Sequence, residues 1–479
     1  MELTDRLLDR YHMRKRGWQV LEFIAAARYA RSLTPGALKD VREMRKAVKR
    51  STKARSGQCL FSLVSAPTVS IVIPVFNQWH LTHQCLASLS ECIARSQAAA
   101  EVIVVDDHST DGTPEGLRQV VGVRVLTNPE NIGFNRAATR GAREARGQYV
   151  VFLNNDAMVL PGWLDGLLAA MGHDRVGAAG SKLVFPSGRL QEAGCLVWND
   201  GSSIMVGRWR SPAAAEYEFL RDVDYCSAAS LMVRADSLRE VGFLDERFSP
   251  AYFEDADLCF SLRARGERVV YAPASVVVHI EGQSHVGGSG PAATNARDTA
   301  HQLRSRRLFV QKWADALRDH VPPPPRPATH EIWGSRRQVL PRVLVCDQAV
   351  DGGAHPSSVQ AQTALRGLTL TTSRITLFVT EEGSLQMTRS LQGAGVEVVC
   401  GAGRRFARFV RRRANFYDVV IVRSTTSFER WMPSVKRHLP GAVLALESHE
   451  LDGARLAQSP DAKSFHRLLA SLLSHSSSD

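Results

Sequence analysis

Carboxylate and amide side chains directly follow two predicted strands, where they could bind a ligand at the edge of a sheet. Asp106 follows the run Val-Ile-Val-Val, and Asn154, Asn155 and Asp156 follow Val-Val-Phe-Leu. A strand-end carboxylate can accept a hydrogen bond from a base or a ribose hydroxyl, although Asp and Asn also form turns and helix caps. A diphosphate needs a hard cation, which takes oxygen ligands and often only one or two carboxylates. Asp156 is a candidate for such a ligand.

Two further polar clusters lie later in the chain. Glu254, Asp255 and Asp257 fall within four positions, flanked by aromatic and aliphatic residues. A carboxylate there could act as a general base, whereas acidic residues at a plain helix start favour the helix dipole. His279 closes the run Ser-Val-Val-Val and precedes a glycine-rich stretch at 282–290. A histidine at a strand end can complete a metal site, although a lone one is usually structural.

The segment that carries the first of these residues alternates between strand and helix patterns. This alternation predicts an α/β fold with a doubly wound, mostly parallel sheet, in which ligands bind beyond the carboxyl ends of the strands. The predicted strands are Val69–Val75, Glu101–Val105, Val123–Leu126 and Tyr149–Leu153, and the predicted helices lie around His83–Ala94, Pro114–Val121 and Asn135–Arg146.

The length of 479 residues predicts two or three domains. Residues 321–341 form a proline-rich linker, and 342–479 repeat the α/β pattern as a smaller Rossmann-like domain with a frayed tail. Its predicted strands are Arg342–Cys346, Ile375–Thr380, Val396–Val399, Val419–Val422 and Ala442–Leu446.

Most of the positive charge lies in the N-terminal arm, predicted to be helical over residues 1–66, with a second helix after Pro35. Residues 1–56 hold 15 Lys and Arg against 6 Asp and Glu, whereas the net charge of the whole chain is +12. The arm could contact an anionic membrane surface or form a solvated helical pair on the main domain, and its charge-broken apolar face favours the second. Nucleic-acid binding is not expected, because the charge is confined to the arm.

The cysteines and the N-terminus bear on the compartment. The 8 cysteines are scattered and form no C-x-x-C pair, which argues against a zinc site or a disulfide framework. The sequence lacks a signal-peptide pattern and an apolar run long enough to span a bilayer. We therefore expect a cytoplasmic protein. If the arm contacts the membrane, the protein would lie peripherally at the inner face of the cell membrane.

Six motifs in order give the region from Val69 to Ser284 a family resemblance. It resembles the inverting glycosyltransferases of family 2, which have the GT-A fold, and in particular the bacterial rhamnosyltransferase-like group that acts on cell-surface polysaccharides. The motifs are Ser-Ile-Val-Ile-Pro-Val-Phe-Asn (70–77), Val-Val-Asp-Asp-His-Ser-Thr-Asp-Gly-Thr (104–113), Asn-Ile-Gly-Phe-Asn-Arg-Ala (131–137), Phe-Leu-Asn-Asn-Asp (152–156), Val-Gly-Phe-Leu-Asp-Glu-Arg-Phe (241–248) and Tyr-Phe-Glu-Asp-Ala-Asp-Leu-Cys (252–259).

The resemblance implies a GT-A domain over 67–320 and a role for each matching residue. It implies Asp255 as catalytic base with Glu254 and Asp257 as supporting carboxylates, and Asp156 and His279 as ligands of Mg²⁺ or Mn²⁺. The implied donor-binding residues are Pro74, Val75, Asn77, Asp106, Asn131, Gly133, Asn135 and Asn155. The implied enzyme is a metal-dependent hexosyl or deoxyhexosyl transferase, with a nucleotide-diphospho-sugar donor and a saccharide or lipid-linked acceptor.

The sequence departs from the family pattern at two positions. Asn154 stands at the first metal-motif position, where the family has Asp, and Ile280-Glu281 follows His279, where a second histidine is common. The segment 198–225 is expected to shape the acceptor site. Residues 342–447 resemble the N-terminal half of a GT-B glycosyltransferase of the family-4 type, and we expect this partial unit to be non-catalytic.

Two other functions are consistent with this fold. A catalytically silent sugar-nucleotide-binding module is disfavoured by the intact Asp156, Asp255 and His279. A nucleotidyltransferase would need a glycine-rich, basic loop after the first strand to hold a triphosphate, and residues 74–78 are neither.

Overall fold

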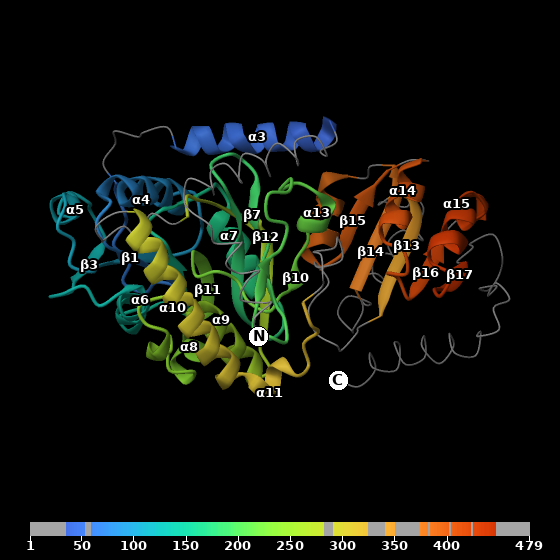
Figure 1. Ribbon diagram of the computed structural model, residues 1–479. Helices are drawn as coiled ribbons and strands as arrows, with labels where there is room; N and C mark the ends of the chain where they lie inside the picture. Colours follow the sequence, from blue (N-terminus) through green and yellow to red (C-terminus); the bar gives the residue numbers. More distant parts are fainter. Residues whose placement is uncertain are drawn as a thin grey trace. The chain divides into compact units, whose positions relative to one another are not determined.

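The computed structural model describes residues 35–52, 59–281, 291–323, 341–349, 374–381, 384–401, 404–422 and 425–446. The chain divides into unit 1, residues 1–217 and 222–323, and unit 2, residues 218–221 and 324–479 (Figure 1). The boundary after residue 323 lies within the proline-rich segment. Residues 1–34 of the arm lie outside the described residues, and the helix expected after Pro35 is confirmed as α3 (Pro35–Thr52).

The first half of unit 1 is a parallel sheet that the sequence predicts closely. β4 (Tyr149–Leu153), β1 (Val69–Val75), β2 (Ala100–Asp106) and β3 (Arg124–Thr127) are adjacent in that order and parallel. Every residue of β1 and β2 is buried, as expected for parallel strands covered by helices on both faces. The predicted helices are confirmed with shifted ends as α4 (Trp79–Ile93), α5 (Thr113–Leu117) and α6 (Phe134–Arg143).

The second half of unit 1 makes the sheet mixed. β11 (Ser230–Arg234) is antiparallel to both β4 and β6 (Val176–Val184), and β12 (Arg268–His279) is parallel to β6. Short strands extend this half: β5 (Ala157–Val159), β7 (Leu190–Glu192) and β10 (Arg221–Asp222), beside a separate β8 (Cys195–Val197) and β9 (Ser203–Met205) pair. The predicted α/β class with a mostly parallel sheet is thus confirmed.

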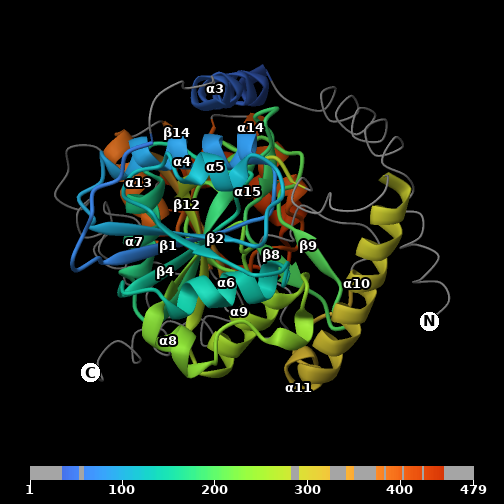
Figure 2. The same ribbon diagram turned by 90° about the vertical axis from the view of Figure 1, so that its left-hand side faces the viewer.

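Helices cover the sheet of unit 1 on both faces. Figure 2 shows α4 and α5 on one side of β1 and β2, with α6 and α9 (Glu254–Ala264) on the other. Gly141 lets α6 approach the strands, because a Cβ there would lie 2.4 Å from Cγ1 of Val72 and 2.8 Å from Cγ2 of Val105. The remaining described elements of this unit are α7 (Trp163–Met171), η1 (Ala215–Tyr217), α8 (Ala235–Glu240), η2 (Glu246–Phe248), α10 (Pro291–Lys312) and α11 (Ala314–Leu317).

Unit 2 contains a parallel sheet of five strands in its described residues. The order is β15 (Glu397–Cys400), β14 (Arg374–Glu381), β13 (Arg342–Ala349), β16 (Val419–Val422) and β17 (Val443–Leu446), which matches the predicted strands. Its helices are α13 (Leu385–Gly393), α14 (Arg404–Arg412) and α15 (Thr425–His438).

A buried ion pair crosses the interior of unit 2. Both guanidinium nitrogens of Arg413 lie 2.6 Å from the carboxylate oxygens of Glu397, and Thr376 donates a further hydrogen bond of 2.8 Å to that carboxylate. Within the described ranges of the two units, no helix combines the length and the apolar character needed to cross a bilayer.

Candidate active site

An antiparallel strand pair brings Asp156 and His279 together. β5 begins directly after Asp156, and its first residue, Ala157, pairs with His279 at the end of β12. The backbone N–H of Ile280 donates to the carbonyl oxygen of Asp156 at 3.2 Å. The two residues are 123 positions apart in the chain, and the strand register fixes them as neighbours.

The side chains at this strand edge converge. Nε2 of His279 lies 3.2 Å from Oδ1 of Asp156 and 3.3 Å from Nδ2 of Asn154, and all three side chains are largely buried. Nδ1 of His279 lies 3.2 Å from Oε1 of Gln191, a side chain on β7. Gln191 can only accept at that oxygen, so Nδ1 carries a proton and the lone pair of Nε2 faces Asp156 in the neutral ring.

This arrangement favours a positive charge between the two side chains. Burial is the largest single influence on the pKa of His279 and lowers it. The Asp156 carboxylate, together with Glu281 and Glu192, raises the pKa by more than this, so that the net shift is upward. A neutral Nε2 would place its lone pair against the Asp156 carboxylate, which is repulsive unless a proton or a cation lies between them. The site therefore suits either an imidazolium or a bound metal ion.

Asp255 lies in the first turn of α9, and this helix begins directly after two residues with left-handed backbone. Tyr252 has φ 78° and Phe253 has φ 71°, which turns the chain sharply into the helix. Oδ1 of Asp255 accepts from the N–H of Ala256 at 2.7 Å, and Oδ2 accepts from the N–H of Ala228 at 3.3 Å. Burial raises the pKa of Asp255 despite these hydrogen bonds.

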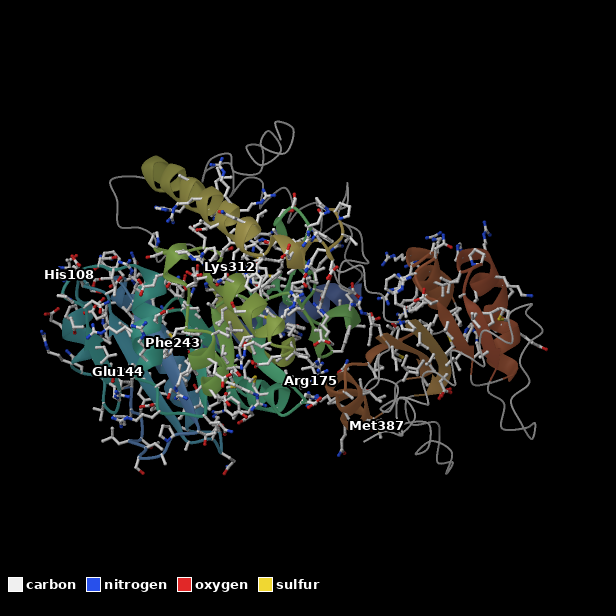
Figure 3. The ribbon with its side chains drawn as sticks, turned by 90° about the horizontal axis from the view of Figure 1, so that it is seen from below. His108, Glu144, Arg175, Phe243, Lys312 and Met387 are labelled. Atoms are coloured by element: carbon white, nitrogen blue, oxygen red, sulfur yellow. The ribbon has the colours of Figure 1, made fainter. Side chains whose placement is uncertain are left out.

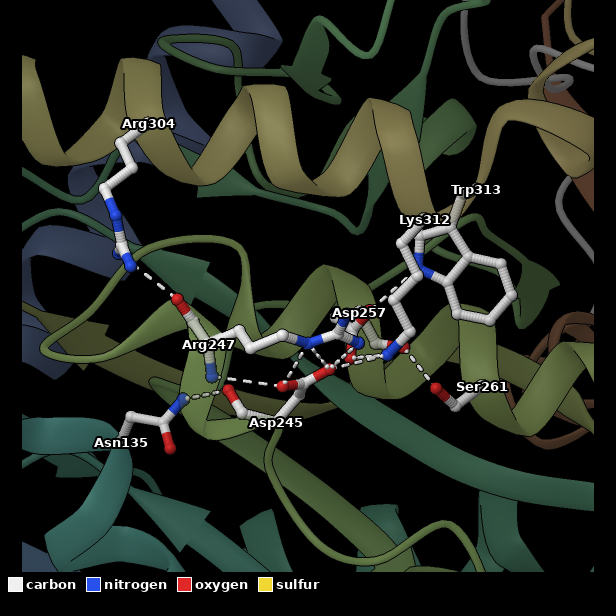
Figure 4. A network of polar contacts seen from close by, with 8 residues as sticks. All are labelled: Asn135, Asp245, Arg247, Asp257, Ser261, Arg304, Lys312 and Trp313. Carbon is white, nitrogen blue, oxygen red and sulfur yellow. Dashed lines mark hydrogen bonds and ion pairs between the residues drawn. The ribbon is translucent and has the colours of Figure 1, made fainter.

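The two other acidic residues of α9 differ from Asp255 in their surroundings. Glu254 is buried, and burial together with the charge of Asp255 raises its pKa well above the ordinary value. Oδ2 of Asp257 lies 2.8 Å from Nζ of Lys312, and its Oδ1 accepts from Nε1 of Trp313 at 2.8 Å. Both oxygens of Asp257 are thus engaged by the end of α10, as Figure 4 shows.

Lys312 connects this contact to a second carboxylate. Its Nζ lies 2.9 Å from Oδ2 of Asp245, which also accepts two hydrogen bonds from Arg247 (Figure 4). These contacts lower the pKa of Asp245, with the hydrogen bond from Arg247 as the largest cause. Through Lys312, Asp257 therefore joins α9 to α10 and to Asp245 at the start of η2.

A carboxylate that the sequence analysis missed lies beside Asp255. Glu192 on β7 is 1% exposed, and its Oε1 accepts from the backbone N–H of Ser227 at 3.1 Å. Burial raises the pKa of Glu192 to about 7, with the Asp255 charge adding to the rise, while Ser227, the Cys195 thiol and His279 reduce it. In the sequence, Glu192 belongs to no recognised motif. The one signal that could have pointed to it is the short, mainly apolar segment that follows it.

One short turn connects these groups, and we call residues 227–229 the central turn. The N–H of Ser227 holds Glu192, and the N–H of Ala228 holds Asp255. The carbonyl oxygen of Ala229 accepts from the N–H of Asn154 at 3.2 Å. The central turn thus lies between the Asp156–His279 pair and the two carboxylates.

The residues after β1 and β2 hold each other at the carboxyl ends of these strands. Oδ1 of Asp106 accepts from the N–H of Ser109 at 3.0 Å. Oδ1 of Asn77 accepts from the N–H groups of Thr110 at 2.8 Å and Asp111 at 3.3 Å, and its own N–H donates to Oγ of Ser109. The structure thus brings Asn77 and Asp106 to the same sheet edge through Ser109. Figure 3 labels His108, which lies in the loop after β2.

Asp107 holds the loop before α6 in place by accepting hydrogen bonds from its backbone. Its carboxylate accepts from the N–H groups of Ile132 at 3.0 Å and Gly133 at 2.9 Å. The same carboxylate accepts from Nδ2 of Asn128 at 2.6 Å. Oδ1 of Asn131 also accepts from Gly133, at 3.2 Å, so that several side chains fix this loop.

Gly133 and Asn135 pack against the segment that precedes α9. Gly133 has φ 84°, and a Cβ there would lie 2.8 Å from Cβ of Pro250. Asn135 donates from its backbone N–H to the carbonyl oxygen of Pro250 at 3.1 Å and from Nδ2 to that of Asp245 at 3.0 Å. Oδ1 of Asn135 is buried and accepts no hydrogen bond from the described residues.

The other three residues implied as donor-binding are interior. Pro74 and Val75 lie within the buried strand β1, where they pair with Val105 and Asp106. Asn155 is 3% exposed and donates from Nδ2 to Oγ1 of Thr82 at 3.1 Å.

The segment 198–225, expected to shape the acceptor site, contacts the residues after His279. Nη2 of Arg208 lies 2.8 Å from Oε2 of Glu281, the residue that departs from the family pattern. The guanidinium also lies over the rings of Phe185 and Trp209, which stack on each other with centroids 4.1 Å apart.

The protein comparisons agree with this architecture. Residues 70–209 match the family model described as glycosyl transferase family 2. The chain is 32% identical over 234 residues to the N-acetylglucosaminyl-diphospho-decaprenol L-rhamnosyltransferase of Mycobacterium tuberculosis, covering 43% of this chain and 74% of that protein. The chain belongs to glycosyltransferase family 2, and unit 1 has the GT-A fold.

Two other matches cover smaller shares or show weaker likeness. The O-antigen biosynthesis protein RfbC of Myxococcus xanthus is 32% identical over 242 residues, which are 47% of this chain and 18% of that protein. The chain spans 26% or less of two of the curated relatives that it matches. A crystal structure of GalNAc-T7 with UDP, GalNAc and Mn²⁺ aligns over 53% of this chain and 49% of that chain, with 18% identity and a TM-score of 0.41.

Proposed function

We propose that unit 1 transfers a sugar from a nucleotide-diphosphate donor to a hydroxyl of a saccharide or lipid-linked acceptor, with inversion at the anomeric carbon. The observation that supports this most is the position of Asp255 and of the Asp156–His279 pair on either side of the central turn. The relatives named for O-antigen synthesis and for rhamnosyl transfer to a lipid diphosphate support a role in the synthesis of cell-surface polysaccharides.

In this proposal Asp255 is the general base. An acceptor hydroxyl is a poor nucleophile, and a carboxylate that removes its proton during attack lowers the barrier. The acceptor oxygen forms a bond to the anomeric carbon, the bond from that carbon to the diphosphate oxygen breaks, and the nucleoside diphosphate departs. The proton goes to Asp255, whose burial raises its pKa and makes it a stronger base than an exposed aspartate.

The Asp156 site fits a divalent cation such as Mg²⁺ or Mn²⁺. Oδ1 of Asn154 is buried and accepts no hydrogen bond from the described residues. Nδ2 of the same amide lies 3.3 Å from Nε2 of His279, and rotation of the amide would turn Oδ1 toward a cation beside Asp156. Gln191 would orient the His279 ring through Nδ1, as residues behind metal-bound histidines commonly do. When bound, the cation would neutralise charge on the departing diphosphate.

The described residues contain no group of three or more His, Cys, Asp or Glu side chains that could hold a metal ion. A cation held by one carboxylate, one imidazole and one amide oxygen would therefore depend on the donor diphosphate for further ligands. This is the usual pattern for Mg²⁺ at phosphate-binding sites. It predicts that metal and donor bind together and that either binds weakly alone.

The donor nucleotide would lie at the carboxyl ends of β1 and β2. Asp106 and Asn77 are the candidates for direct contact with the base or ribose, because their strand-end loops meet there. The other residues would act through the backbone or by packing, and they are Pro74, Val75, Asn131, Gly133, Asn135 and Asn155.

The test is a transfer screen with UDP-, GDP- and dTDP-activated sugars and a panel of p-nitrophenyl monosaccharides and short lipid-diphosphate sugars. Asp255→Asn keeps the side-chain shape and should lower turnover by about 10²-fold or more, with donor affinity unchanged. Asp236→Asn, an exposed aspartate at the first turn of α8, is the matched control. Near-normal turnover of Asp255→Asn, or retention of the donor's anomeric configuration, would contradict the proposal.

The metal site has its own test. Treatment with a chelator and the Asp156→Ala substitution should each abolish transfer, and added Mn²⁺ should restore activity only to the chelated wild-type protein. Donor binding measured by calorimetry should weaken in both cases, because the diphosphate loses its cation. Full activity in chelator would exclude a metal-dependent reaction.

We propose that unit 2 is accessory to the chemistry. Every residue assigned a role in transfer lies in unit 1. A chain ending at residue 323 should fold and retain transfer to a simple acceptor. A folded but inactive truncated protein would show that unit 2 contributes to the reaction.

A further inference from the structure

Glu192 is the buried carboxylate nearest to the proposed base along the central turn. Its Oε1 is held by the N–H of Ser227, whereas the next N–H in the chain, that of Ala228, holds Oδ2 of Asp255. Two carboxylate oxygens bound to the N–H groups of consecutive residues lie within about 10 Å of each other, because neighbouring Cα atoms are only about 3.8 Å apart. The charge of Asp255 accordingly acts on the pKa of Glu192.

The second oxygen of Glu192 lacks a strong hydrogen-bond donor, and the weakly donating Cys195 thiol is the side chain whose hydrogen bond lowers the pKa of this carboxyl group. Oε2 is buried and receives no hydrogen bond from any nitrogen or oxygen of the described residues. A buried carboxylate with an unsatisfied oxygen costs stability, so a purely structural role does not account for it. Glutamine of the same shape would remove the buried charge, and its unpaired amide N–H₂ group would bring a smaller cost of its own.

We propose that Glu192 is a positioning residue that makes Asp255 a stronger base by placing a second negative charge beside it. The proposal rests on the assignment of Asp255 as general base. Glu192 itself is 1% exposed, so it acts through Asp255 and does not contact the acceptor.

The physical basis is the reciprocal effect of two like charges. Each ionised carboxylate disfavours ionisation of the other, so the pair loses its protons in two steps, and the second proton is held more strongly. The charge of Asp255 raises the pKa of Glu192. Because repulsion between two charges is mutual, Glu192, once it is ionised, holds a proton on Asp255 more tightly. A base with a pKa nearer to the working pH removes a hydroxyl proton more effectively.

Among the buried acidic groups around Asp255, Glu192 is the one whose charge changes near working pH. Burial raises the pKa values of Cys195 and Tyr225 well above their ordinary values and that of Cys259 to about 12, so these groups are neutral at working pH. Burial, followed by the Asp255 charge, likewise raises the pKa of Glu254. His279 on β12 contributes a positive charge when protonated, and that charge acts in the opposite direction on Glu192.

The experiment compares pH–rate profiles of wild type and Glu192→Gln. The substrates are the nucleotide sugar and acceptor that turn over in the transfer screen, or the nucleotide sugar and water if no acceptor does. Removing the charge should move the acidic limb of kcat to lower pH by about one unit and lower the plateau about 3- to 30-fold. Donor affinity should be unchanged. Glu115→Gln, which alters an exposed glutamate of α5, is the control and should leave the profile in place.

The outcomes separate this inference from the proposed function. If Asp255→Asn is inactive but the Glu192→Gln profile coincides with that of wild type, Glu192 does not tune the base, and the inference alone fails. If Asp255→Asn is fully active, the proposed function fails. If Glu192→Gln does not fold, Glu192→Asp replaces it in the experiment because it retains the charge. Its pH–rate profile should keep the wild-type acidic limb, and a shift of that limb to lower pH would overturn the inference.

Discussion

Replacing Glu192 by Gln should stabilise unit 1 increasingly as the pH rises from about 4.5 to 7. The pKa of Glu192 is about 7 in the folded protein, against an ordinary value of 4.5, and burial is the main cause. The folded state therefore binds this proton more tightly than the unfolded state. Above pH 4.5 the unfolded chain releases the proton first, so the wild type loses stability until the folded-state pKa is passed.

The size of the effect follows from the shift. A rise of this size corresponds to about 3 kcal/mol, since one pKa unit is about 1.4 kcal/mol. The glutamine amide brings a fixed cost of its own, because its N–H₂ group finds no acceptor where Oε2 was unsatisfied. The difference in stability between variant and wild type should thus change by about 3 kcal/mol between pH 4 and pH 8, whatever its absolute value.

The assay is urea denaturation of both proteins at intervals between pH 4 and pH 8.5. The free energy of unfolding is taken from the transition whose midpoint differs between wild type and variant. A difference that grows with pH and levels off near pH 7 supports a buried, ionising Glu192. A difference that is constant with pH would refute the reasoning, because Glu192 would then ionise equally in both states.

Three further substitutions test packing and charge. Gly133→Ala should cost about 1–3 kcal/mol, since its backbone favours glycine, and should weaken donor binding measured by calorimetry. Glu397→Gln leaves Arg413 buried without its partner and should lower the denaturation midpoint of unit 2 by an amount equivalent to about 3–5 kcal/mol. Lys312→Met should destabilise unit 1 by about 2 kcal/mol or more at pH 7, and the loss should shrink in acid as Asp257 becomes protonated. A loss that is independent of pH would contradict that ion pair.

The sequence predicted the elements whose patterns are local. The strands β1, β2 and β4 consist mainly of apolar residues and are followed by polar clusters, so their bounds were predicted to within one residue. Four strands of unit 2 were predicted to within one residue at each end, whereas β13 continues three residues beyond the predicted Cys346. The partial GT-B resemblance of unit 2 stays a prediction.

The elements that depend on long-range pairing were not predicted. β11 is antiparallel between two other strands, and its five residues show no pattern that distinguishes this direction. The meeting of Asp156 with His279 follows from the pairing of β5 with β12, for which the three residues of β5 give no local signal. The family resemblance supplied that pair, and neither the resemblance nor the pattern supplied Glu192.

The central turn has a consequence for how acceptor preference could diverge. In the proposed mechanism, three successive peptide units set the spacing between the general base and the donor side, and their dimensions do not depend on which side chains surround them. Substitutions in the segment 198–225 could therefore reshape the space for an acceptor while the distance over which a sugar travels stays constant. In such an arrangement, the residues that recognise the acceptor are separate from those that hold the reacting groups. The acceptor could therefore change without substitutions among the reacting groups.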